Sequence, residues 1–125
     1  MKKTLQDLSV KLYRRASGAA ASSAEEIIPA ESAWELINNG AFLLDVRSEK
    51  EVAEGTLNGA VNIPHDQLSE RLTEIPVEKD HPIVVFCAVG GRASIAQDLL
   101  KEAGFKHVHN AGGYKDLLKC RPAGV

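Results

Sequence analysis

Cysteine is scarce in this chain of 125 residues, which contains only Cys87 and Cys120. These two residues are 33 positions apart and form no CxxC pair and no Cys/His cluster, the spacings that are typical of zinc sites and of small disulfide-stabilised domains. We therefore expect no metal, no cofactor and no disulfide framework. A reducing compartment is the simpler location, and we assign the protein to the cytoplasm.

Long apolar runs are also missing. No uninterrupted apolar stretch approaches the roughly 20 residues that span a bilayer. The first residues, Met1–Leu5, resemble the start of a secretory signal, but charged residues interrupt the segment that follows: Asp7, Lys11, Arg14 and Arg15. A signal peptide needs an apolar stretch there. We expect neither secretion nor stable membrane insertion.

Positive charge is in short supply over most of the chain. The formal net charge is −2, and residues 25–125 hold ten basic against sixteen acidic residues. An acidic body offers no broad electrostatic surface for nucleic acid, and no sequence of a common nucleic-acid module is present. We therefore expect no nucleic-acid partner.

The N-terminal segment differs from the rest, because residues 1–24 carry five basic residues and one acid. Leu5, Leu8 and Leu12 share one helical face, which leaves a transit peptide or a membrane-surface helix as alternatives. We favour a partly helical or flexible appendage. The predicted division is an appendage at 1–26, one domain at 27–120 and a tail at 121–125.

From residue 27 onward, helical and strand-like hydrophobic patterns alternate. We expect helices around residues 33–37, 48–55, 68–75 and 95–103, and strands at 27–28, 41–46, 60–63, 83–86 and 107–110. The last helix carries an apolar stripe, which we expect to face the sheet: Ile95, Ala96, Leu99, Leu100 and Ala103. Ser48 and Glu51 have the spacing of a capping box, and the continuous apolar run at 83–86 is typical of a central parallel strand. This alternation predicts an α/β sandwich with a mostly parallel sheet of four to five strands flanked by helices.

The chemistry is concentrated after the strand at 83–86, in the loop Cys87-Ala88-Val89-Gly90-Gly91-Arg92. Ligand sites of open parallel sheets lie beyond the carboxyl ends of strands. Two adjacent glycines let backbone N–H groups turn inward and form a nest for an anion, and a helix N-terminus acts in the same direction. Such surroundings favour the reactive thiolate of Cys87. The alternative is a buried structural cysteine.

The loop Cys87–Arg92 resembles the active-site loop of the rhodanese family. Leu44–Arg47, Glu54–Pro64 and Ala111–Gly113 resemble further blocks of that family, in the same order, so that the resemblance covers residues 27–119. It implies a three-layer sandwich and a sulfurtransferase that moves sulfane sulfur from a donor such as thiosulfate to cyanide or a thiol. A small-molecule donor and acceptor are the implied partners, with an acceptor protein as an alternative.

By the same resemblance, Cys87 is the nucleophile and forms a persulfide, and the other five loop residues surround the substrate: Ala88, Val89, Gly90, Gly91 and Arg92. The chain departs from the pattern at Ala88, where thiosulfate-using members often carry a basic residue. It also has Tyr114 and Leu117 in a region where the family often has a tryptophan, for which we expect a packing difference.

Two other functions remain open. A cysteine phosphatase or arsenate reductase of related fold uses a Cys-x5-Arg loop, whereas this chain has Cys-x4-Arg with Ala93 in the next position. A non-catalytic rhodanese-like module is expected where the loop cysteine is lost, and Cys87 is present.

The remaining polar candidates are predicted to be structural. Asp45 and Arg47 end a strand at the edge where the loop lies, and we favour an ion pair that fixes a turn over a role in positioning substrate. Trp34 is expected in the core, and Cys120 is expected to be a mobile free thiol rather than a partner of Cys87. Three histidines lack any pattern of metal ligands and are expected to be packing or surface residues: His65, His107 and His109.

Overall fold

The computed structural model describes residues 27–122. The elements are α2 (Ala30–Asn38), β1 (Phe42–Asp45), α3 (Glu49–Ala53), β2 (Val61–Asn62), the 3-10 turns η1 (Leu68–Glu70) and η2 (Leu72–Glu74), β3 (Ile83–Cys87), α4 (Gly91–Glu102), β4 (Val108–Gly113) and α5 (Tyr114–Lys119). The predictions for the appendage at 1–26, including its leucine face, lie outside the described residues, as do residues 123–125 of the predicted tail. No helix within residues 27–122 is long and apolar enough to cross a membrane.

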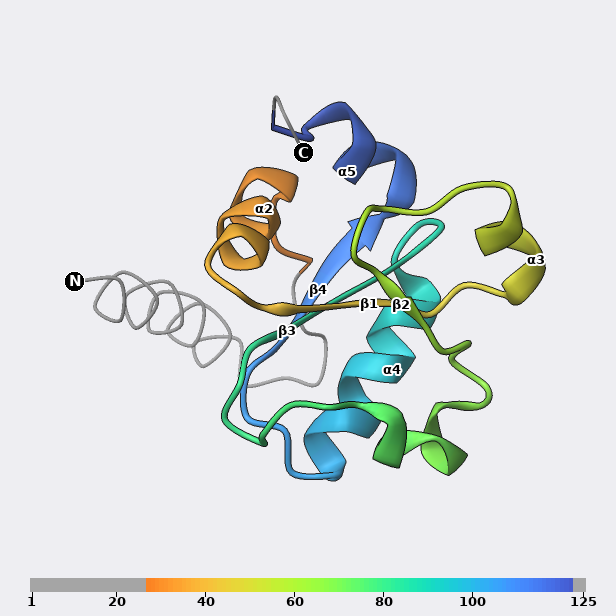
Figure 1. Ribbon diagram of the computed structural model, residues 1–125, viewed down its shortest axis with the longest axis vertical. Helices are drawn as coiled ribbons and strands as arrows, with labels where there is room; N and C mark the ends of the chain where they lie inside the picture. The colour runs from red at the N-terminus through yellow and green to blue at the C-terminus, as the bar shows by residue number, and fades with distance from the viewer. Residues whose placement is uncertain (1–26, 123–125) are drawn as a thin grey trace.

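One sheet organises the described part of the chain. Its four strands are all parallel and lie in the order β2-β1-β3-β4 (Figure 1). Leu44 on β1 pairs with Val61 on β2 and with Val85 on β3. The five residues of β3 are all buried, as expected for the centre of a parallel sheet that is covered on both faces. The predicted α/β class with a mostly parallel sheet is confirmed.

Helices cover both faces of the sheet, which gives three layers. Side chains alternate across a strand, so Val84 and Phe86 of β3 belong to the core beneath α2 and α5, whereas Val85 and Cys87 belong to the core beneath α4. Figure 1 shows α2 and α5 together on one side of the strands and α4 on the other. Cys87 therefore lies on the α4 face, at the carboxyl end of the central strand.

Two local predictions are confirmed. Ser48 and Glu51 form a capping box at the start of α3, in which the Ser48 side chain accepts a hydrogen bond from the Glu51 backbone and the Glu51 side chain accepts one from the Ser48 backbone. Trp34 is buried in the core, and its Nε1–H donates to the carbonyl oxygen of Leu117 at 2.9 Å. The hydrogen bond from Trp34 to Leu117 joins α2 to α5.

Three local predictions are wrong. Residues 68–75 form two 3-10 turns rather than a helix, because Arg71, with φ −121° and ψ 20°, leaves helical geometry and ends the first turn after three residues. Residues 27–28 form no strand: Pro29 follows at once and caps α2, so that Ile28 makes one ladder-like hydrogen bond, to the carbonyl oxygen of Asn110 at 2.9 Å. Ile95, expected on the buried face of its helix, is 54% exposed.

Candidate active site

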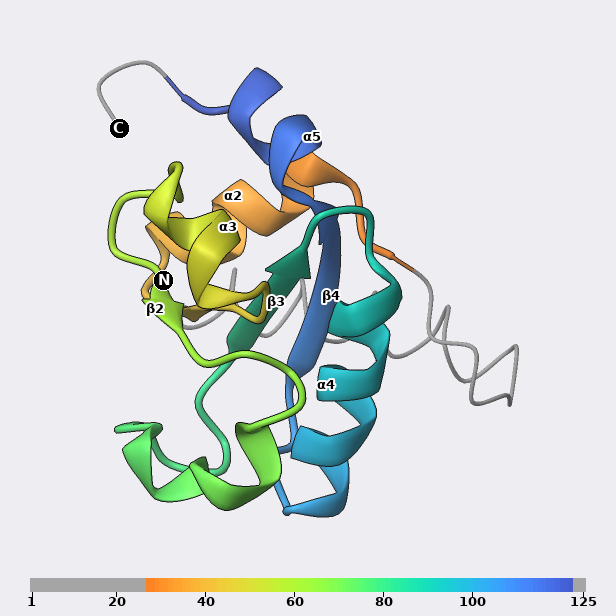
Figure 2. The same cartoon turned by 90° about the vertical axis from the view of Figure 1, so that its right-hand side faces the viewer.

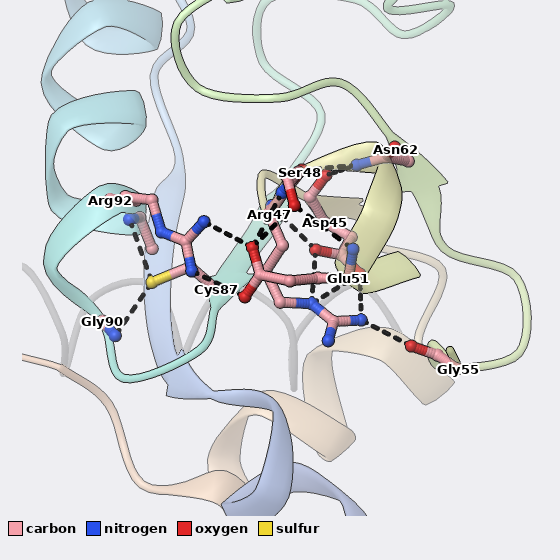
Figure 3. A network of polar contacts seen from close by, with 10 residues as sticks. Asp45, Arg47, Ser48, Glu51, Gly55, Asn62, Cys87, Gly90 and Arg92 are labelled. Carbon is pink, nitrogen blue, oxygen red and sulfur yellow. Dashed lines mark hydrogen bonds and ion pairs between the residues drawn. The ribbon is translucent and has the colours of Figure 1, made fainter. Parts of the chain in front are cut away.

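The site is built at the point where β3 passes into α4. Figure 2 shows the joining segment crossing the carboxyl end of β4 before α4 begins. Cys87 is the last residue of β3 and is 1% exposed. Its Sγ accepts a hydrogen bond from the backbone N–H of Gly90 at 2.9 Å and another from Ala93 at 3.4 Å (Figure 3). The Ala93 N–H belongs to the first turn of α4, where backbone donors have no helical partner.

Of the two adjacent glycines in the loop, only Gly90 adopts a conformation that requires glycine. Gly90 has a φ of 112°, in the left-handed region, whereas Gly91 is already the first residue of α4. A Cβ at Gly90 would also lie 2.7 Å from Cδ1 of Ile27, while a Cβ at Gly91 would meet nothing within 4 Å. The turn that directs an N–H at the thiol therefore requires glycine at position 90.

The other predicted loop residues lie around this cradle. Ala88 and Val89 are exposed, Val89 at 83%. Both line a pocket of about 390 Å³, together with Arg47, Glu51, Glu54, Gly55, Tyr114 and Lys115. The pocket opens beside the loop, so a small molecule bound there would lie next to the segment that carries Cys87.

Arg92 has a partner that the sequence did not predict. Its guanidinium makes two contacts with the Glu51 carboxylate, Nη1 to Oε1 at 2.7 Å and Nη2 to Oε2 at 3.0 Å. This hydrogen bonding from Arg92, together with that from Ser48, lowers the pKa of Glu51 to about 2 against the opposing effect of burial. The pKa of Arg92 is raised mainly by Glu51, with a smaller electrostatic contribution from Cys87. The pair joins the start of α3 to the loop.

Asp45 and Arg47 form the ion pair that the sequence predicted. Arg47 Nη2 lies 2.8 Å from Asp45 Oδ2, and the two side chains are 6% and 0% exposed. Arg47 also donates to the carbonyl oxygen of Gly55 at 2.7 Å, and Thr56 donates to Asp45 at 2.7 Å. Because these bonds join the end of β1 to the segment after α3, the pair fixes a turn of the chain.

The Rhodanese-like domain family matches residues 29–120. The chain belongs to the rhodanese-like domain family.

Named relatives agree with the enzyme class that the sequence predicts. The thiosulfate sulfurtransferase PspE of Escherichia coli is 35% identical over 81 residues, which cover 65% of this chain and 78% of that protein. The thiosulfate:glutathione sulfurtransferase of Homo sapiens is 35% identical, with 67% of this chain and 84% of that protein covered. The solved structure of the human single-domain sulfurtransferase TSTD1 has a TM-score of 0.68 at 30% identity, covering 77% of this chain and 97% of that chain.

The structure explains how this rhodanese domain accommodates its departure from the family pattern near the C-terminus. The Tyr114 ring stacks on Phe86 with 6.2 Å between ring centroids, and the Arg47 guanidinium lies 4.1 Å from the centre of the Tyr114 ring. Tyr114 thus covers the buried ion pair with a cation–π contact. A packing role near the end of β4 is filled by tyrosine.

The remaining candidates of this rhodanese domain lie away from the thiol cradle. His109 is buried, and burial lowers its pKa to about 4; His107 is partly buried, and His65 lines a separate pocket of about 180 Å³ beside Arg92. Cys120 is a free thiol whose pKa is raised by burial and by Glu31. Across residues 27–122, no three side chains of His, Cys, Asp or Glu gather closely enough to hold a metal ion.

Proposed function

We propose that the chain is a sulfurtransferase that carries sulfane sulfur on Cys87 as a persulfide. The observation that carries this proposal is the pair of backbone N–H groups, from Gly90 and Ala93, directed at the Cys87 sulfur. Hydrogen-bond donors directed at a sulfur atom stabilise the negative charge that it carries as nucleophile and as leaving group. The names of the relatives support the same chemistry.

In the first step, the Cys87 thiolate attacks the outer sulfur of thiosulfate. A bond forms between Sγ and this sulfur, the S–S bond of the donor breaks, and sulfite leaves with the electron pair. The negative charge then resides on the outer sulfur of Cys87–S–S⁻. The N–H groups that surround Sγ, together with the N-terminal end of α4, stabilise negative charge throughout the step.

In the second step, an acceptor attacks the outer sulfur and the Cys87 thiolate departs. Cyanide becomes thiocyanate, and a thiolate becomes a persulfide anion. The pocket of about 390 Å³ beside Ala88 and Val89 provides room for an acceptor larger than cyanide, such as a low-molecular-weight thiol. Because Val89 is exposed, the loop is also accessible to a thiol presented by an acceptor protein. We propose the cytoplasm as the location of this reaction.

Arg92 is the single charged residue of the loop, and its positive charge is compensated by the ion pair with Glu51. With Ala88 in place of a basic residue, the loop itself brings little net positive charge to an anionic donor. We therefore propose that the backbone N–H groups, rather than side-chain cations, provide most of the binding to thiosulfate.

Phosphatase chemistry is the competing function. A phosphoryl transition state presents three equatorial oxygens that need surrounding donors, and the six-residue loop of Cys87–Arg92 provides fewer N–H groups than a seven-residue loop. In addition, the Arg92 guanidinium is engaged by Glu51. Both observations favour transfer of a single sulfur atom.

The test is thiosulfate:cyanide transfer by the full chain. Cys87→Ser should abolish turnover, because a hydroxyl cannot hold a transferable sulfane sulfur, and Cys120→Ser serves as the matched control and should retain most of it. Release of phosphate from an aryl phosphate should not exceed that of Cys87→Ser. Normal sulfur transfer by Cys87→Ser would refute the proposal, and strong Cys87-dependent phosphate release would establish the competing function.

A further inference from the structure

Asn110 is a buried amide on β4 that contacts the thiol cradle. It is 1% exposed. Its Nδ2 donates to the carbonyl oxygen of Gly90 at 3.1 Å, and its Oδ1 accepts from the backbone N–H of Gly112 at 2.8 Å. Both ends of the side chain are therefore used, the donor end on the loop and the acceptor end on its own strand.

The Gly90 contact bears on Cys87, because Gly90 is the residue whose N–H lies 2.9 Å from Sγ. The φ of 112° at Gly90 sets the direction of that N–H relative to the next peptide group. Glycine has unusual backbone freedom, so contacts at its carbonyl oxygen help to hold its conformation. That oxygen receives two bonds, from the Ser94 N–H at 3.0 Å and from Asn110.

Asn110 is itself held rigidly. Its backbone pairs with Val85 in the β3–β4 ladder, and its carbonyl oxygen accepts the Ile28 N–H at 2.9 Å. The ladder then shifts register, so that Cys87 pairs with Gly113. The bond from Gly112 to Asn110 Oδ1 lies within this bulge and fixes the rotation of the amide, leaving Nδ2 directed at the loop.

We propose that Asn110 is a positioning residue for sulfur transfer: by holding the Gly90 carbonyl it fixes the backbone torsions of Gly90, so that the Gly90 N–H points at the sulfur of Cys87. The inference rests on the proposed function. The role needs a side chain that donates at one end and accepts at the other, within the length of an amide. Aspartate offers acceptors alone, and serine is too short to reach the Gly90 oxygen while it still caps the Gly112 N–H.

The test uses Asn110→Asp and Asn110→Ser in the full chain, with Cys120→Ser as the background so that Cys87 is the one thiol. Both substitutions keep an acceptor for Gly112 and remove the donor to Gly90. The readout is the rate of Cys87 alkylation by iodoacetamide as a function of pH, which reports the thiolate and needs no sulfur donor. Thiosulfate:cyanide transfer and the melting temperature are measured alongside.

Asn62→Asp is the matched control, because Asn62 donates to the backbone oxygens of Asp45 and Arg47, both at 2.9 Å, and not to the loop. In Asn110→Ser the Gly90 N–H should turn away from Sγ, and the loss of this one hydrogen bond to a charged sulfur should slow alkylation at pH 7 about tenfold. In Asn110→Asp the rate should fall further, because a carboxylate would face the Gly90 carbonyl oxygen. The pH curve should move upward and sulfur transfer should fall in parallel. Asn62→Asp should lower the melting temperature without moving the curve.

Folded Asn110 variants that retain the parent pH curve would overturn the inference. Loss of folding in both would also contradict it, since Asn110 would then serve the fold and not the thiol. Failure of the proposed function is a separate result: the parent chain would form no Cys87 persulfide, whatever the alkylation curves show.

Discussion

Gly113, the last residue of β4, lies directly against the loop residues Ala88 and Val89, and this contact predicts the effect of Gly113→Ala. Gly113 has an ordinary backbone conformation, with φ −105° and ψ 146°, so alanine introduces no torsional strain there. A Cβ would, however, lie 2.5 Å from the carbonyl oxygen of Ala88 and 3.5 Å from Cα of Val89. Real Cβ atoms essentially never approach closer than 3.0 Å, so the loop must move by at least half an ångström.

The loss of stability in Gly113→Ala depends on which atoms must move to make room for the Cβ. The obstructing atom is backbone, one residue after Cys87, and a side-chain rotation cannot relieve the contact. Overpacking of this kind costs about 1–3 kcal/mol, which corresponds to a fall in melting temperature of about 5–15 °C for a domain of this size. Because the displaced segment leads into the Gly90 cradle, sulfur transfer should fall by about 10-fold to 100-fold, the range expected for a misplacement of up to 1 Å.

Gly91→Ala is the matched control for this experiment. It adds the same methyl group to the same loop, but its Cβ would meet nothing within 4 Å, and Gly91 is the first residue of α4. We expect it to fold with a melting temperature equal to or slightly above that of the parent, since alanine is the better helix former. Thermal unfolding and initial rates of thiosulfate:cyanide transfer are the assays. A Gly113→Ala protein as stable and as active as Gly91→Ala would refute the steric argument.

Two further predictions concern stability. Arg47→Ala leaves the buried carboxylate of Asp45 without its partner and should lower the free energy of unfolding by about 3–5 kcal/mol; urea denaturation at pH 7 measures it, and a loss below about 1 kcal/mol would contradict the buried pair. For His109, burial lowers the pKa to about 4, below the ordinary 6.5, so between these values the unfolded chain binds a proton that the folded chain does not. Stability should therefore fall as the pH drops from 6.5 to 4, by about 3 kcal/mol in all, and His109→Gln should flatten this slope; an identical slope in both proteins would assign the acid loss to other groups.

Much of the fold follows from local patterns in the sequence. The run at 83–86 is apolar on both faces, and it forms the central strand, with Cys87 at its end. The capping box of Ser48 and Glu51 depends on residues three apart, and it is present. The helix predicted at 68–75 was wrong, because apolar spacing alone does not distinguish a helix from two successive 3-10 turns that bury Leu68.

The contacts that shape the candidate site are tertiary and could not be predicted from spacing. Glu51 carries a local signal as a capping residue, but its bond to Arg92 spans 41 positions. Asn110 lies in a segment that the sequence predicts as a short strand. Its hydrogen bond to the Gly90 carbonyl oxygen depends on the register of β4 against β3. In both cases the partner is set by how strands and helices pack, so the chain order of the residues contains no local sign of the pairing.

The persulfide of Cys87 is tested most directly by the mass of the intact protein after incubation with thiosulfate and removal of small molecules. We expect a gain of one sulfur atom per chain, located on Cys87 by peptide mapping, retained in Cys120→Ser, absent in Cys87→Ser and removed by cyanide. A chain that turns over thiosulfate with cyanide while Cys87 gains no sulfur, or gains it on Cys120 alone, would contradict the persulfide mechanism.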